Sequence, residues 1–320
     1  MTSTIDQRPA VPTLLAYRPW RGQFRGPTAG MWAIARTALH LLLRRRLFWG
    51  LYALCVMIFL FFFYGQYLQS WIGTQLGDKP LPVGNIILPF TGPELRDALR
   101  NALQLDGSGY TYGNFIWFEG YLVMIVLALA GSILVGNDFH FRSLPFYLSK
   151  PLHRWHYLGG KFLAVAVFTN LITTVPAIVL YIQYGLIDSW SYYYTGAKLL
   201  LGIVGYGALL TTCLGLLLLA SACWLRRTVP LVMVWTALFV FGRLMSALLV
   251  DGLQLNVRWR LVDLWNNMYL VGNWCLRIPS TSIRPLPQPP AWEAGLVLSA
   301  VCLACVAYLN RQIQAVEIVP

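Results

Sequence analysis

Residues 47–68 read LFWGLYALCVMIFLFFFYGQYL and contain no charged side chain. About 20 apolar residues in a helix are enough to cross the roughly 30 Å hydrocarbon core of a bilayer. The whole chain is 58% hydrophobic and only 11% charged, a composition outside the range of soluble domains. The sequence therefore predicts an all-α polytopic membrane protein in which this segment is the first transmembrane helix.

Five further segments have a similar length and apolar composition. One of them contains Arg243 within its apolar run, and another extends outward through Glu119. We therefore expect six transmembrane helices that together form one bundle. The predicted spans are approximately 47–68, 117–136, 162–187, 199–225, 229–250 and 291–309.

The basic residues are distributed unevenly among the predicted loops. If the N-terminus is cytoplasmic, the inner segments hold fifteen Lys and Arg residues and three acidic residues, whereas the outer segments hold eight and nine. Lys and Arg are enriched in the cytoplasmic loops of membrane proteins. The distribution predicts a multi-pass protein of the cell membrane with both termini in the cytoplasm. It also accounts for the net charge of +12 without a nucleic-acid partner.

The segment before the first span has two different parts. Its beginning contains four prolines among arginines, a composition that favours an extended chain. In the helix predicted after it, Arg36, His40 and Arg44 form one polar stripe, which is typical of an amphipathic helix in the membrane interface. An ordinary basic flank of the first span is the alternative. The expected division of the chain is an extended N-terminus (1–30), the interfacial helix (31–46), the six-span membrane domain (47–309) and a cytoplasmic tail (310–320).

The sequence contains no catalytic or nucleotide-binding motif. The GGKF stretch at residues 159–162 lacks the upstream glycine and the hydroxyl group of a P-loop, and neither GxSxG nor HExxH is present. The histidines between residues 140 and 156 lack enough neighbouring ligands for a metal site. We expect no catalytic residue, no bound cofactor and no metal in this chain.

A few polar residues lie within the predicted spans. Because a charge in the membrane is costly, Arg243 is expected either to face the bundle, with Glu119 as a candidate counterion, or to extend toward water at the outer surface. Asn170 and Thr174 either line a polar path or bond to neighbouring helices. Residues 261–274 of the last outer loop are too polar to span and too aromatic for a free loop, so they predict a half-buried surface helix.

The inner loop between the second and third spans is the most polar connection in the chain. Residues 136–162 read GNDFHFRSLPFYLSKPLHRWHYLGGKF, in which aromatic residues alternate with basic residues and prolines. Exposed aromatic residues with arginine are typical of protein docking surfaces. A loop that rests only on lipid head groups is the alternative.

The same loop resembles the segment between the second and third spans of ABC-2 type transporter permeases. In that family an acidic residue is followed by a basic residue, leucines, Ser-x-Pro, a further basic residue and a Gly-Lys pair. The sequence departs from many relatives at RSLP (142–145), where they have a Gly-Thr pair. The matching positions are Asp138, Arg142, Leu148, Ser149, Pro151, Arg154, Gly160 and Lys161.

This resemblance implies the permease subunit of an ABC transporter, with export as the usual direction. Such permeases pair as two six-span subunits and bind a separate ATP-binding subunit, which holds the ATP, through a coupling helix in this cytoplasmic loop, here residues 138–157. The residues expected to contact the ATPase subunit are Asp138, Arg142, Phe146, Ser149, Pro151, Arg154 and Trp155.

Two alternative functions stay open. One is a multi-pass enzyme that acts on lipid or glycan, which would need acidic or histidine residues clustered at one depth. The other is a non-transporting scaffold that recruits an ATPase.

Overall fold

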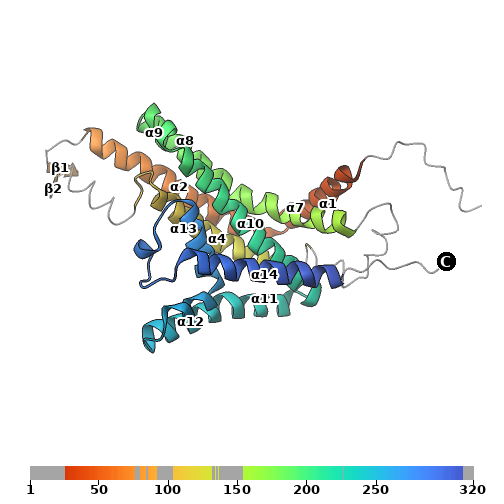
Figure 1. The fold of residues 1–320 in the computed structure, drawn as a ribbon. Coiled ribbons are helices and arrows are strands. Elements are labelled where there is room, and N and C mark those ends of the chain that lie inside the picture. The colour runs from red at the N-terminus through yellow and green to blue at the C-terminus, as the bar shows by residue number, and fades with distance from the viewer. Residues whose placement is uncertain are drawn as a thin grey trace, which may run out of the picture.

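Almost all of the described residues form helices in the computed structural model of the chain (Figure 1). The two strands among them, β1 (Pro80–Val83) and β2 (Ile86–Thr91), are short and pair antiparallel with each other. The helical content agrees with the predicted all-α class. The residues that the structure describes are 26–75, 80–83, 86–91, 104–131, 134, 136, 154–225 and 227–312.

Six helical segments of the described chain are long and apolar enough to cross a membrane, which confirms the predicted number of spans. Several of them are longer than the predicted spans, because the backbone hydrogen bonds of a helix continue through polar and aromatic residues at its ends. The helices that form the six spans are α2 (Arg46–Gln75), α4 (Gly109–Gly131), α7 (Arg154–Ile172) with α8 (Thr174–Ile187), α10 (Ala197–Leu225), α11 (Thr228–Thr236) with α12 (Gly242–Ala247), and α14 (Ala291–Gln312).

Successive spans run in opposite directions, so their connections alternate between the two ends of the bundle (Figure 1). One end, called here the α1 end, contains α1 (Pro27–Leu43), the beginning of α7 and the C-terminal end of α14. The opposite end, called the α13 end, contains the β-hairpin, α9 (Trp190–Thr195) and α13 (Leu264–Cys275). This alternation is the arrangement that six consecutive membrane crossings require.

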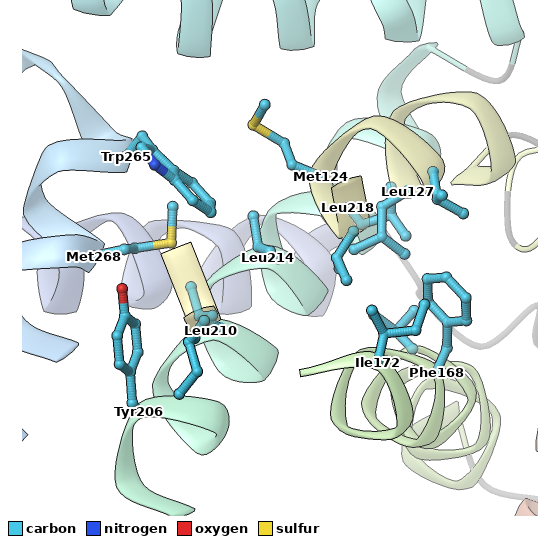
Figure 2. Close-up of a cluster of buried hydrophobic side chains, with 14 of the residues drawn as sticks. Met124, Leu127, Phe168, Ile172, Tyr206, Leu210, Leu214, Leu218, Trp265 and Met268 are labelled. Carbon is cyan, nitrogen blue, oxygen red and sulfur yellow. The ribbon is translucent and has the colours of Figure 1, made fainter. Parts of the chain in front are cut away.

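The centre of the bundle is α10, which contacts α4, α7, α8, α13 and α14. Figure 2 shows the side chains of Leu210, Leu214 and Leu218 on α10, where they meet residues of α4, α7 and α13. These leucines follow one another at intervals of four residues and are at most 1% exposed, so they form one continuous ridge along the helix. In a bilayer this close packing, rather than removal of apolar surface from water, holds helices together.

The helix α13 confirms the helix predicted for residues 261–274 and is more deeply buried than expected. Its 12 residues extend for only about 18 Å, too short to cross a bilayer. Two glycines allow it to approach its neighbours. Gly120 of α4 lies against the Trp265 ring, and Gly272 of α13 lies against the Tyr206 ring of α10, so a Cβ atom at either position would collide with an aromatic carbon. The helix therefore packs inside the α13 end of the bundle.

The helix α1 packs along α7 through small side chains. Its buried face contains Ala35 and Ala38, while Arg36 and His40 of the predicted polar stripe are exposed. On α7, a Cβ atom at Gly160 would lie 2.9 Å from both the Cβ atom of Ile34 and the carbonyl oxygen of Met31. The Gly160 position of the inner-loop motif therefore has a structural reason, because only glycine permits this approach of the two helices.

We predict that Gly160→Ala destabilises the protein by about 1–3 kcal/mol, the usual cost of overpacking a closely packed contact. The matched control is Gly50→Ala in α2, where an added Cβ atom meets no atom within 4 Å. Because alanine favours helices over glycine, the control should be neutral or stabilising by up to about 1 kcal/mol. Thermal unfolding midpoints in detergent measure both effects, and an unchanged midpoint for Gly160→Ala would contradict the close packing of α1 on α7.

Candidate functional site

A cavity of about 590 Å³ lies at the α13 end, between α2, α4, α12 and α13. Ligand sites of small molecules typically have volumes of about 300–1,000 Å³. Its wall combines flat apolar rings with charged groups, which is the chemistry of an amphipathic site. The aromatic residues of the wall are Phe61, Phe62, Trp117, Phe118, Tyr121, Trp265 and Tyr269. The charged residues are Arg243, Asp251, Arg260, Asp263 and Arg284.

Arg243 lies in this wall, on a span whose helix is irregular on both sides. The π-helical turns Ala237–Phe241 and Leu248–Gly252 precede and follow α12, and such turns often occur at functional sites. The Arg243 guanidinium donates a hydrogen bond to the Tyr121 hydroxyl, and its central carbon lies 5.9 Å from the centre of the Tyr121 ring. The structure therefore directs Arg243 toward the bundle and the cavity.

The structure does not pair Arg243 with Glu119, the counterion considered from the sequence. Within the described part of the chain, the two side chains form no ion pair. Glu119 is 1% exposed and lies beside Cys55 of α2. Tyr121, the partner of Arg243, follows Glu119 by two residues, which places the two side chains about 200° apart around α4. Glu119 and Tyr121 therefore face opposite sides of α4.

Arg260 is the most buried charge of the cavity wall, with an exposed fraction of 3%. Its guanidinium donates to the Asp251 carboxylate at 2.6 Å and to the Pro287 carbonyl oxygen at 2.7 Å. Nearby, the side-chain amides of Asn266 and Gln288 donate to each other at 3.0 and 3.1 Å. These bonds attach the segment before α14, which contains Arg284, to α13 and to the short helix Val257–Val262 that precedes it.

Asp263 caps the N-terminus of α13 from within the same wall. Its carboxylate accepts hydrogen bonds from the backbone N–H groups of Trp265 and Asn266 at 2.9 and 3.1 Å, as expected of an N-cap residue. Burial raises the pKa of Asp263, although these N–H groups and the positive charges of Arg243 and Arg260 act in the opposite direction. Both acidic groups of the wall are thus engaged, Asp251 in an ion pair and Asp263 in a helix cap.

Asn170 and Thr174 belong to a separate polar cluster at the junction of α7 and α8. The Asn170 amide donates to the Ala166 carbonyl oxygen at 2.8 Å and to the Thr211 hydroxyl at 2.9 Å, and the Thr174 hydroxyl donates to the Asn170 oxygen at 2.7 Å. Pro176 lies in the first turn of α8 and has no N–H group to continue the ladder of α7. This cluster joins two spans by hydrogen bonds. The four polar-path candidates therefore occupy three separate places in the bundle.

The residues expected to dock an ATPase lie mostly outside the described residues. These are Asp138, Arg142, Phe146, Ser149 and Pro151. Arg154 is the first residue of α7, and Trp155, which follows it, is 45% exposed. The coupling helix expected in this loop also lies outside the described part of the chain.

Lys161 lies in α7, the helix that follows the same inner loop. It is 6% exposed, and its ammonium group donates to the Leu134 carbonyl oxygen at 2.5 Å. The same ammonium group lies 5.7 Å from the centre of the Tyr157 ring. Lys161 therefore attaches α7 to the end of the preceding span from a buried position.

The cysteines form one close pair across two spans. Cys302 of α14 and Cys213 of α10 have their sulfur atoms 3.8 Å apart. Among the residues that the structure describes, no three His, Cys, Asp or Glu side chains are arranged to hold a metal ion. We therefore assign no metal ligands.

Sequence reasoning identified Arg243 but missed most of the cavity around it. In the sequence, three of the charged residues of the wall were recognisable only as charges of outer loops: Asp251, Arg260 and Arg284. Asp263 was recognisable only as a residue of the predicted helix 261–274. The position of these residues in one cavity wall is apparent only in the fold, in which α13 packs back between the spans. The combination of charged residues with the aromatic residues of 261–274 is unusual for a solvated loop. This combination was the signal in the sequence that could have indicated the cavity.

No model of a known protein family matches the chain, and a comparison with curated proteins also finds no match. The resemblance to ABC-2 permeases therefore depends on the motif of residues 136–162 and on the order of the spans.

We predict that Arg260→Met destabilises the protein by about 1.5–3 kcal/mol, because it removes hydrogen bonds made by a charged donor. Asp251→Asn should cost about 1–3 kcal/mol, because the buried guanidinium of Arg260 loses its counterion although it keeps its bond to Pro287. Thermal unfolding in detergent measures both, with Arg277→Met at an exposed position of the same end as the control. Equal midpoints for the Arg260 and Arg277 variants would show that Arg260 does not fasten this segment.

Proposed function

We propose that the chain is the permease subunit of an ABC transporter and that it works in export. The observation that carries the proposal is the inner-loop motif, because it connects α4 to α7 at the α1 end of a six-span bundle (Figure 1). A transporter fits this bundle better than an enzyme, because the two acidic groups of the cavity are already engaged in an ion pair and a helix cap. ATP hydrolysis belongs to the partner subunit in this proposal.

The α1 end is the cytoplasmic end in this proposal. It contains the exposed arginines Arg44, Arg45, Arg227 and Arg311, in agreement with the enrichment of Lys and Arg on the cytoplasmic side of membranes. The exposed face of α1 combines Arg36 and His40 with Trp32, which is 55% exposed. Tryptophan and basic residues together favour the head-group region, so this supports α1 as an interfacial helix.

A second permease subunit fits the sides of the bundle. The first, fifth and sixth spans bury a smaller share of their residues within the chain than the other three. Their remaining surfaces face lipid or another six-span subunit. In the proposed mechanism, ATP binding at the partner subunits moves the two six-span halves relative to each other as rigid bodies. The internal packing around α10 is suited to such movement, because it makes each half a single body.

The docking of an ATPase is tested by Arg154→Ala combined with Trp155→Ala. Truncation of an aromatic or arginine hot spot typically costs about 2 kcal/mol or more, which corresponds to roughly a thirtyfold loss of affinity. The double variant should therefore lose the ATP-hydrolysing protein during purification from its own cells, while it still inserts in the membrane. The measurement is the amount of ATPase that co-purifies with the variant and with the wild type.

The matched control is Trp190→Ala combined with Lys198→Ala, which removes an exposed tryptophan and a basic residue from the α13 end. This control should retain the ATPase. Equal recovery with both double variants would place the docking surface elsewhere. Absence of any co-purified ATPase from the wild type would contradict the proposed function and favour a membrane enzyme or another class of membrane protein.

The orientation is tested by cysteine labelling in intact cells, after replacement of the six native cysteines. A membrane-impermeant thiol reagent should modify Thr281→Cys at the α13 end and leave Thr228→Cys at the α1 end unmodified. Both threonines are exposed, so access to the reagent depends on the side of the membrane. Labelling of Thr228→Cys alone would reverse the proposed orientation.

A further inference from the structure

The cavity at the α13 end has an excess of positive charge. Three arginines and two aspartates line it, and Arg260 and Asp251 neutralise each other. The Asp263 carboxylate accepts hydrogen bonds from two backbone N–H groups of α13. Within the described part of the chain, neither Arg243 nor Arg284 forms an ion pair with a carboxylate. The cavity therefore presents two arginines that an anionic ligand could pair with.

These two arginines lie at different depths. Arg243 precedes Gly252, the last residue of its span, by nine positions, which corresponds to roughly 13 Å along a helix. Arg284 lies beyond the span, in the segment that leads to α14. A ligand that contacts both would therefore extend from the membrane surface into the upper part of the bilayer.

The apolar part of the cavity wall continues onto the lateral surface of the bundle. Phe61 of α2 and Phe118 of α4 line the cavity, and they are also 54% and 46% exposed. Both residues lie within spans, so their exposed surface faces the lipid in the bilayer. An acyl chain could thus enter the cavity from the side while its head group reaches the arginines.

We propose that this cavity binds an amphiphile with an anionic, phosphate-bearing head group, with an anionic phospholipid of the outer leaflet as the occupant. The guanidinium groups of Arg243 and Arg284 contact the head group, because arginine forms paired hydrogen bonds with phosphate oxygens. The rings of Phe61, Phe118 and Tyr121 contact the apolar part. A soluble phosphate compound shares the head-group chemistry but does not use the aromatic wall. This binding does not require that the chain be a permease.

The test uses the purified chain, without any ATPase, in bilayers of phosphatidylcholine that contain a minor fraction of phosphatidylglycerol. After extraction, native mass spectrometry counts the lipids that remain bound. The wild type should retain phosphatidylglycerol in preference to phosphatidylcholine. Arg243→Gln combined with Arg284→Gln should lower the affinity for phosphatidylglycerol about tenfold or more, a change of about 1.4 kcal/mol.

The matched control is Lys198→Gln combined with Arg277→Gln, which removes two exposed positive charges from the same end without touching the cavity. It should retain phosphatidylglycerol as the wild type does. Ala247→Phe is a second test, because it fills the cavity with a ring and keeps both arginines. It should also lower retention.

Three results would overturn the proposal. They are equal retention of the two lipids by the wild type, an equal loss in the two double variants, and full retention by Ala247→Phe. Inorganic phosphate at the concentration of the lipid should not displace phosphatidylglycerol. Its displacement would assign the cavity to a soluble anion instead of a lipid.

Discussion

Close packing of α13 against α4 and α10 is the contact on which the α13 end depends. A helix too short to cross the membrane gains little from removal of apolar surface among lipid chains, so its place is determined by complementary shape. Gly120 and Gly272 provide that shape, because each one accepts an aromatic ring of the facing helix. With α13 in place, Trp265 and Tyr269 become one wall of the cavity. Larger residues at the two glycines would remove this wall along with the contact.

The charged residues of the cavity are stabilised by partners from the elements around α13. Charges within a membrane are costly unless they have partners or access to water, and these partners come from α4, from the turn Leu248–Gly252 and from the segment before α14. Tyr121 accepts a hydrogen bond from Arg243 and packs against Trp265 with its ring tilted, the ring centres 4.4 Å apart. Arg260 reaches Asp251 and the Pro287 carbonyl oxygen. Partners from three separate segments thus allow the two arginines to lie at the edge of the bilayer.

The two ends of the bundle differ in chemistry and are joined by α10. The α1 end is basic, and its helices meet through small residues, as at Gly160. The α13 end combines aromatic rings with both signs of charge. Because α10 contacts α7 as well as α13, the packed leucines of α10 form a continuous connection from the α1 end to the helix that lines the cavity. This is the physical link between the proposed docking loop and the proposed ligand cavity.

The sequence by itself determined the number of spans and the all-α class, because hydropathy is a property of each segment and does not depend on its neighbours. It also singled out Arg243 as an unusual charge. The partner of Arg243 was decided by the tertiary structure, since Tyr121 and Glu119 are two residues apart and face opposite sides of α4. Likewise, Asn170 and Thr174 were recognisable as polar residues within a span, but only the fold shows that they bond to each other and to Thr211. Which side chains face one another depends on how the helices are rotated and packed, and that rotation is set by contacts between segments far apart in the chain.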